Sequence, residues 1–248
     1  TIEDLYKVKN VSSPMLSNSG EKIAFTVSES DLPKGKSITT VYVMNKNGSS
    51  LISVSDKVPG AYSPFWSLSD DLYLINKGQV YKYSFETNES VQVTDFYAGV
   101  SDPILSNDGR YIAFTAELFP ECGTDNDCNK RLDESSSNGP VQAYIADELL
   151  FRHWTDYKGE KESYLVLFDT KEKKYQTITS SDVLAGAYML GGGPKFAFSP
   201  DSRVLAYVSS PEKNIANSTN TDIYLMPIGG KEAVNITLAN DAWDGSPV

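Results

Sequence analysis

Apolar and polar positions form a block that recurs along the chain. Each block starts with a short apolar strand and passes through a turn rich in Ser, Asn, Asp and Gly. A second strand of small and aromatic apolar residues follows. The turn residues tolerate left-handed backbone and cap the turn with their side-chain oxygens, so each block predicts a β-hairpin. The copies span residues 13–25, 63–74, 102–114 and 196–207. The fourth copy departs from the pattern, because Phe196 stands where the others have proline.

One serine occupies the same turn position in every copy. These serines are Ser17, Ser67, Ser106 and Ser199, at spacings of 50, 39 and 93 residues. The first two spacings match a four-stranded propeller blade of about 40–50 residues. Period-two strand patterns follow the hairpins, as half-buried antiparallel strands require. They supply third and fourth strands at 40–44 and 51–54, 79–83 and 91–93, 164–168 and 175–178, and 222–226 and 234–236.

The fold class predicted from this repeat is all-β, a β-propeller of four-stranded antiparallel blades. The long spacing holds only one third-and-fourth strand pair, so we expect one blade with a partly helical insertion at 118–161. A single incomplete propeller domain then covers 1–248. Its blades span about 11–56, 61–95, 100–180 and 194–238, and a fifth begins at 244–248. Four blades and a fraction do not close a ring of the usual form, so we expect the natural protein to be longer.

Charge and hydropathy exclude several classes of protein. The formal net charge is −11 over 248 residues, whereas a nucleic-acid binder usually carries a basic face. The longest basic cluster, Lys171 to Lys174, is interrupted by Glu172 and is typical of a solvated turn. No window approaches the roughly 18 apolar residues of a membrane span. The first residues do not resemble a signal peptide, but a mature exported protein would also lack one.

The two cysteines bear on the cellular compartment. Cys122 and Cys128 lie six residues apart in a polar loop. The loop is flexible enough to bring them within disulfide range, although two free thiols in a cytosolic loop are the alternative. A disulfide indicates a secreted or periplasmic protein. Five Asn-x-Ser/Thr triplets carry little weight in an Asn- and Ser-rich chain. They begin at Asn10, Asn47, Asn88, Asn217 and Asn235.

The repeat resembles the one shared by N-terminal propellers of the prolyl oligopeptidase family and by free-standing periplasmic propellers. The insertion helps to distinguish these two groups of propellers. Residues 147–157, which include Arg152-His153-Trp154, resemble a segment of the acylaminoacyl-peptidase and dipeptidyl-peptidase V branch. Residues 119–122 with Cys128 resemble exported bacterial members of that branch. The resemblance covers essentially the whole chain.

The resemblance implies a C-terminal α/β-hydrolase domain that carries a Ser, Asp and His for peptide cleavage. This chain has no Gly-x-Ser-x-Gly elbow, and His153 is its only histidine. We therefore expect no catalytic residue here and no peptidase activity from the chain alone. No cofactor or metal is expected either. Residues 125–127 echo part of a calcium loop but lack its Gly and distal Glu. Gly191–Gly193 lacks the Lys-Ser/Thr of a phosphate loop.

The insertion holds the candidate substrate-binding residues. In the family, propeller carboxylates hold the free ammonium of a dipeptidyl-peptidase substrate, and Asp147 and Glu148 form an acidic pair here. Arg152 would fix a carbonyl, or hold Glu148 four residues earlier on one helical face. Trp154 and Tyr157 would wall a side-chain pocket.

Each candidate also has a structural interpretation. The acidic pair fits a solvated helix, and Arg152 fits an internal salt bridge. His153 fits a hydrogen-bonded packing residue, and Trp154 fits a core anchor for the insertion.

Two functions follow. The first is the propeller of a secreted or periplasmic serine exopeptidase, which gates and shapes the pocket for short peptides. The second is a non-catalytic periplasmic propeller that binds protein or glycan partners. Either function is compatible with a homodimer.

Overall fold

The computed structural model describes residues 1–139, 143, 145–147, 149, 152–153, 156–157, 159–179, 195–212 and 217–248. For residues 153 and 156 it describes the backbone alone. The chain divides into two compact units, residues 1–100 and 101–248. None of the helices in these ranges is long and apolar enough to cross a membrane.

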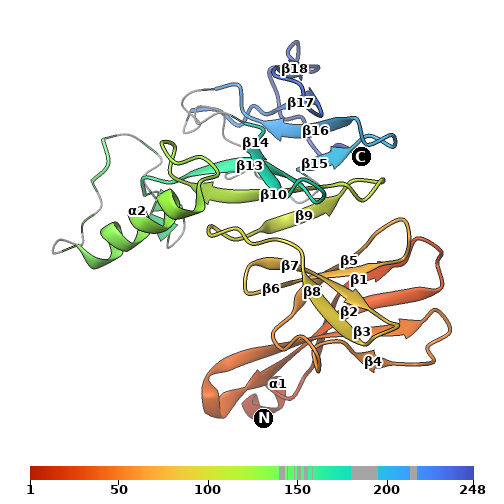
Figure 1. Ribbon diagram of the computed structural model, residues 1–248. Helices are drawn as coiled ribbons and strands as arrows, with labels where there is room; N and C mark the ends of the chain where they lie inside the picture. Colours follow the sequence, from red (N-terminus) through yellow and green to blue (C-terminus); the bar gives the residue numbers. More distant parts are fainter. Residues whose placement is uncertain are drawn as a thin grey trace. The chain divides into compact units, whose positions relative to one another are not determined.

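The first unit contains two four-stranded antiparallel sheets, each formed by strands consecutive in the chain (Figure 1). Sheet 1 comprises β1 (Asn10–Leu16), β2 (Lys22–Asp31), β3 (Lys36–Asn45) and β4 (Ile52–Ser53). Sheet 2 comprises β5 (Tyr62–Trp66), β6 (Leu72–Asn76), β7 (Gln79–Ser84) and β8 (Glu89–Gln92). Helix α1 (Ile2–Leu5) precedes sheet 1, and a 3₁₀ turn, η1 (Leu32–Lys34), joins β2 to β3.

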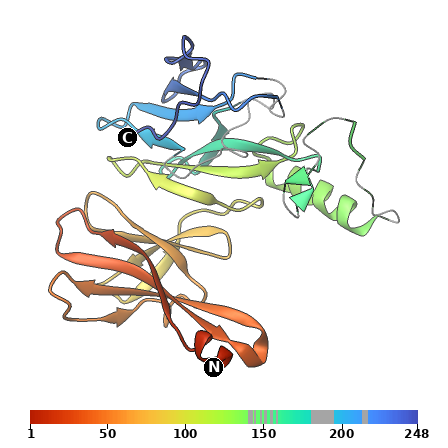
Figure 2. The same ribbon diagram turned by 180° about the vertical axis from the view of Figure 1, so that it is seen from behind.

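The second unit repeats this plan (Figure 2). Sheet 3 comprises β9 (Ser101–Leu105), β10 (Tyr111–Leu118), β13 (Glu162–Asp169) and β14 (Lys174–Thr177). Sheet 4 comprises β15 (Phe196–Phe198), β16 (Val204–Ser209), β17 (Asp222–Pro227) and β18 (Val234–Asn235). Helix α2 (Asn126–Asn138) and a short hairpin, β11 (Arg152–His153) with β12 (Asp156–Tyr157), lie between β10 and β13. Four four-stranded antiparallel sheets confirm the predicted fold class. The predicted domain limits stay a prediction.

Burial follows the period-two pattern that predicted the strands. In the first unit, apolar side chains of sheets 1 and 2 form one cluster that includes Val41, Val43, Leu72 and Leu74. In the second unit, sheets 3 and 4 form another cluster, around Leu165, Leu205 and Met226. Each cluster draws on two sheets, because a sheet with one apolar face has to bury it against a neighbour.

The serine that marks each copy organises its turn. Ser17, Ser67, Ser106 and Ser199 each accept, through their backbone carbonyl, the N–H three residues later. Each hydroxyl also accepts an N–H from a residue at the start of the returning strand or just before it, as from Tyr111 to Ser106 at 2.8 Å. The residue three after each serine has a φ between +60° and +73°. These residues are Gly20, Asp70, Gly109 and Ser202. Gly, Asp and Ser in the turn therefore meet a backbone requirement.

Each sheet contains a side-chain hydroxyl, just after its fourth strand, that completes the backbone pairing of its third strand. The sequence pattern does not reveal this role. The side chains of Ser55, Thr94, Thr179 and Thr237, each just after a fourth strand, accept the N–H of the third-strand residue 14 positions earlier. Thr94 is 1% exposed, accepts from Val80 at 2.9 Å and donates to Oε1 of Gln79 at 2.9 Å. The hydroxyl thus completes the pairing where the fourth strand turns away.

Turns of adjacent sheets are joined in the same way in both units. Asn18 donates its side-chain N–H to the Leu68 carbonyl, and the Ser19 N–H donates to Oδ1 of Asp70, both at 3.0 Å. In the second unit Asn107 donates to the Pro200 carbonyl at 3.0 Å. The Asp108 N–H there donates to the Ser202 hydroxyl at 3.1 Å. Hydrogen bonds from Ser19 lower the pKa of Asp70.

We predict that Thr94→Val lowers the free energy of unfolding by about 1–3 kcal/mol, because the isosteric change leaves the buried Val80 N–H without its acceptor, while Oε1 of Gln79 keeps the Phe96 N–H. Chemical denaturation of the chain measures this. The matched control is Thr87→Val on an exposed turn, expected to stay within about 0.5 kcal/mol of the parent. Equal stabilities for the two variants would contradict the role given to the hydroxyl.

A pH dependence follows from the lowered pKa of Asp70. A carboxylate with a lowered folded pKa stabilises the fold above its ordinary pKa, and this stabilisation disappears as the pH falls through the folded pKa. We expect Asp70→Asn to be less stable than the parent at neutral pH, with the difference closing on acidification. Denaturation at a series of pH values measures it. Glu86→Gln, which removes an exposed carboxylate of the same unit, should show no such closing difference.

Candidate functional site

The insertion is rooted at one end of sheet 3. Strands β10 and β13 pair over eight positions, from Tyr111 with Asp169 to Leu118 with Glu162. Residues 119–161 therefore leave and rejoin the sheet at the same place, beside a fully buried Leu118. Figures 1 and 2 both show α2 beyond this end of the sheet.

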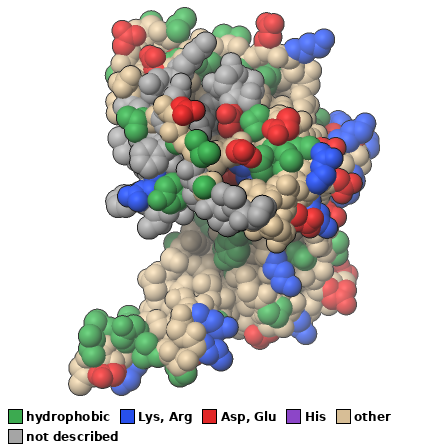
Figure 3. Space-filling model, turned by 90° about the vertical axis from the view of Figure 1, so that its left-hand side faces the viewer, with side chains coloured by type: hydrophobic (Ala, Val, Ile, Leu, Met, Phe, Trp, Pro, Cys, Tyr) green, Lys and Arg blue, Asp and Glu red, His purple; other side chains and the backbone are tan. Residues whose placement is uncertain are grey.

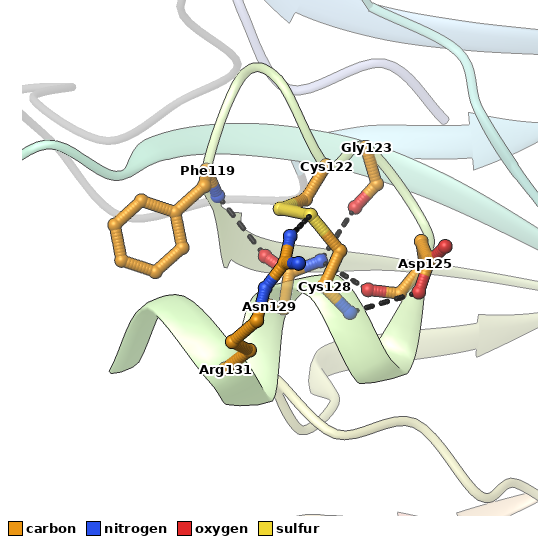
Figure 4. Close-up of a disulfide and its surroundings, with 7 residues drawn as sticks. All are labelled: Phe119, Cys122, Gly123, Asp125, Cys128, Asn129 and Arg131. Carbon is orange, nitrogen blue, oxygen red and sulfur yellow. Dashed lines mark hydrogen bonds between the residues drawn. A yellow bond between two sulfur atoms is a disulfide. The ribbon is translucent and has the colours of Figure 1, made fainter. Parts of the chain in front are cut away.

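Asn129 is the hub at the base of the insertion (Figure 4). Its side chain is 2% exposed and makes three hydrogen bonds. Oδ1 accepts from the Phe119 N–H at 3.1 Å, and Nδ2 donates to the carbonyls of Gly123 and Asp125 at 2.9 and 2.8 Å. One amide therefore joins the end of β10, the following turn and the first turn of α2.

The predicted disulfide closes the same turn. Cys122 and Cys128 are bonded, with their Cα atoms 5.5 Å apart. Asp125 is the N-cap of α2, and its Oδ1 accepts the Cys128 N–H at 2.9 Å. Residues 125–127, considered above as a partial calcium loop, thus start a helix. Among the described residues, no group of three or more His, Cys, Asp or Glu side chains is placed to hold a metal.

Lys161 ties α2 to the start of β13. Its ammonium lies 2.6 Å from Oδ1 of Asp133 and 5.3 Å from the centre of the Phe119 ring. Asp133 is one helical turn after Asn129, so both contacts use the same side of α2. The two strand ends and the helix are fastened together at the base of the insertion.

Two of the predicted substrate-binding residues come together in the β11–β12 hairpin. Arg152 pairs with Tyr157 across the strands, and its guanidinium carbon lies 5.9 Å from the centre of the tyrosine ring. Both side chains are exposed on the surface of the hairpin. His153 pairs with Asp156 in the same hairpin.

The remaining candidates are placed differently. Asp147 is exposed and does not lie in a helix, whereas Glu148 and Trp154 lie outside the described residues. Because Arg152 belongs to a β-strand, the expectation that it shares a helical face with Glu148 is wrong. Sequence reasoning missed Asn129, since a single Asn in a polar run carries no periodic signal. Asp125 was detectable as an N-cap three residues before Cys128.

A second surface feature lies in the first unit. A shallow depression of about 470 Å³ separates α1 from the β2–β3 hairpin, with Tyr6, Leu32 and Ile38 among its lining residues. Hydrophobic side chains gather at this projecting end (Figure 3). Exposed ion pairs flank it, Lys7 with Asp4 and Lys34 with Asp31. None of its lining side chains supplies a nucleophile beside a base.

Known proteins resemble the chain over its full length. Two curated relatives, the dipeptidyl-peptidase 5 proteins of Porphyromonas endodontalis and Porphyromonas gingivalis, are each 24% identical. The similarity covers 100% of this chain and 36% of either relative. The predicted resemblance to the prolyl oligopeptidase family is confirmed. No family profile matches the chain.

Solved structures agree on the β-propeller fold. An acylaminoacyl peptidase bound to Z-Gly-Gly-Phe-chloromethyl ketone superposes with a TM-score of 0.66 at 12% identity. It covers 95% of this chain and 33% of its own. The Pyrococcus horikoshii acylaminoacyl peptidase gives a TM-score of 0.63 at 12% identity, with coverages of 94% and 33%. TolB from Acinetobacter baumannii gives 0.51 at 13%, with coverages of 92% and 44%. The propeller sheets are thus common to peptidases and to TolB.

We predict that Asn129→Ala lowers the free energy of unfolding by about 1–3 kcal/mol, because it leaves the Phe119 N–H and the Gly123 carbonyl without their buried partner, while the Asp125 carbonyl keeps the main-chain N–H of residue 129. Chemical denaturation measures it, and faster amide exchange of Phe119 locates the effect. Asn138→Ala is the control, since that exposed side chain donates only to Glu134 within α2. If both variants were equally stable, Asn129 would not be the hub.

Proposed function

We propose that this chain is the propeller portion of a secreted or periplasmic serine exopeptidase of dipeptidyl-peptidase or acylaminoacyl-peptidase type. The propeller gates and shapes the pocket for short peptides, and hydrolysis takes place on a separate α/β-hydrolase domain. The observation that carries the proposal is the similarity to dipeptidyl-peptidase 5 proteins over the whole chain. The chain spans about a third of the length of these relatives, which leaves room for a catalytic domain.

The chemistry of the insertion supports a role in peptide recognition. The exposed Asp147 carboxylate suits a free α-ammonium, and the Arg152 guanidinium suits a carbonyl or a carboxylate. The Tyr157 ring beside Arg152 supplies apolar surface for a side chain. Glu148 and Trp154 are proposed to act with them, as a second carboxylate and a pocket wall.

The base of the insertion supports the same proposal. A binding group has to be held by the scaffold if it is to select one substrate geometry. The Asn129 hub, the disulfide and Lys161 give the insertion such a base. The disulfide also favours an oxidising compartment, in keeping with a secreted or periplasmic protein.

The first test compares substitutions in the full-length protein that carries this chain. We expect Asp147→Asn to raise KM for dipeptidyl substrates with a free N-terminus about two- to fivefold, as for an exposed ion pair, with kcat unchanged. An N-acetylated substrate should show no such change. Glu160→Gln, which removes an exposed carboxylate from the same insertion, is the matched control. An equal effect of both substitutions would remove Asp147 from the proposed site.

The second test uses residues 1–248 alone. We expect no hydrolysis of peptide substrates and no labelling by serine-directed fluorophosphonates, because the chain has no nucleophile elbow and its only histidine is His153. If the full-length protein were also inert towards peptides but bound protein or glycan partners, the non-catalytic propeller would be the function. Labelling of residues 1–248 would contradict the location of catalysis on another domain.

A further inference from the structure

Helix α2 depends on polar contacts and on one covalent bond. Asn129 is its only buried residue, and no apolar side chain of the helix is fully buried. A 13-residue helix is marginal in water unless tertiary contacts hold it. The ion pair between Lys161 and Asp133 is partly exposed, and such pairs contribute little. The Cys122–Cys128 bond therefore shares with the Asn129 amide the attachment of α2 to the turn after β10.

The surroundings of Cys128 favour its reduced form more than those of an ordinary structural disulfide. Cys128 is the third residue of α2, where the helix N-terminus stabilises a thiolate. Nη2 of Arg131 lies 3.8 Å from its sulfur (Figure 4). Asp127 in the first turn and the N-cap Asp125, whose Oδ1 accepts the Cys128 N–H at 2.9 Å, oppose this effect. Cys122 is 8% exposed, whereas Cys128 is half-buried, so Cys128 is the more accessible of the two residues.

We propose that Cys122–Cys128 is a redox-sensitive latch, which fixes the start of α2 when oxidised and releases it when reduced. The thiolate of a small dithiol attacks the Cys128 sulfur and bonds to it, and the bond to Cys122 breaks. The electron pair leaves on the Cys122 sulfur, which takes up a proton. The second thiol of the reductant then displaces Cys128 as a thiolate beside Arg131 and closes the oxidised reductant into a ring. The protein gains two electrons.

The latch reopens and recloses without unfolding the sheet. Cys122 and Cys128 lie six residues apart in the chain, which keeps the two sulfurs close enough to reoxidise. Strands β10 and β13 are paired through eight positions that do not involve the cysteines. The change is thus confined to the turn and to α2. It does not depend on the proposed peptidase function.

Amide hydrogen exchange of residues 1–248 tests the latch, with and without a small dithiol. We expect reduction without denaturant, and faster exchange at Cys128, Asn129 and the following turns of α2. Exchange at Leu165 and Val166 in β13 should not change. The double variant Cys122→Ser, Cys128→Ser should exchange like the reduced chain. Unchanged protection of α2 after reduction, or a disulfide that is reduced only in denaturant, would overturn the proposal.

Reduction kinetics test the contribution of Arg131. We expect Arg131→Gln to slow reduction by the dithiol about two- to fivefold, as expected for the loss of one exposed charge interaction. Lys130→Gln, which removes the same charge one residue earlier, is the matched control and should reduce at the parent rate. Alkylation of free thiols followed by intact-mass measurement gives both rates. Equal reduction rates for the two variants would show that Arg131 does not promote reduction of the disulfide.

Discussion

The pairing of β10 with β13 is the constraint on which the candidate site depends. Both strands are almost wholly buried, so their backbone groups have to pair with each other over the full length of the ladder. An insertion between two such strands cannot begin in the middle of the ladder. It has to leave after Leu118 and return before Glu162. The position of the insertion therefore follows from the hydrogen-bonding demand of the sheet.

The same demand explains why small polar residues recur at fixed places in all four sheets. The serine that marks each copy accepts an N–H from the returning strand, as Ser106 does from Tyr111. A second hydroxyl, just after the fourth strand, accepts the N–H of the third-strand residue 14 positions earlier, as Thr94 does from Val80. Loss of such a buried hydroxyl leaves a main-chain N–H without its acceptor. This costs more free energy of folding than the hydrogen bond itself contributes. Polar side chains thus complete the pairing within each sheet, and an apolar cluster in each unit joins its two sheets.

The insertion joins this rigid scaffold to a polar, mostly exposed extension. Its base is held by the Asn129 amide, the disulfide and the Lys161 contacts, whereas Asp147, Arg152 and Tyr157 lie exposed further along. Such a division suits recognition, since the base limits where the exposed groups go and the exposed groups meet the ligand. It also makes the first turn of α2 sensitive to the state of a single covalent bond.

The amino-acid sequence predicts the sheets, their order and the place of the insertion, because turn residues and period-two burial are local signals. The disulfide was also foreseen, since its partners are six residues apart. The Asn129 hub, the hydroxyls after the fourth strands and the strand conformation of Arg152 are visible only in the folded chain. These depend on partners distant in the chain or on a hairpin whose pattern is too short to read. A lone Asn or Thr shows its role only when the fold brings an unpaired N–H to it.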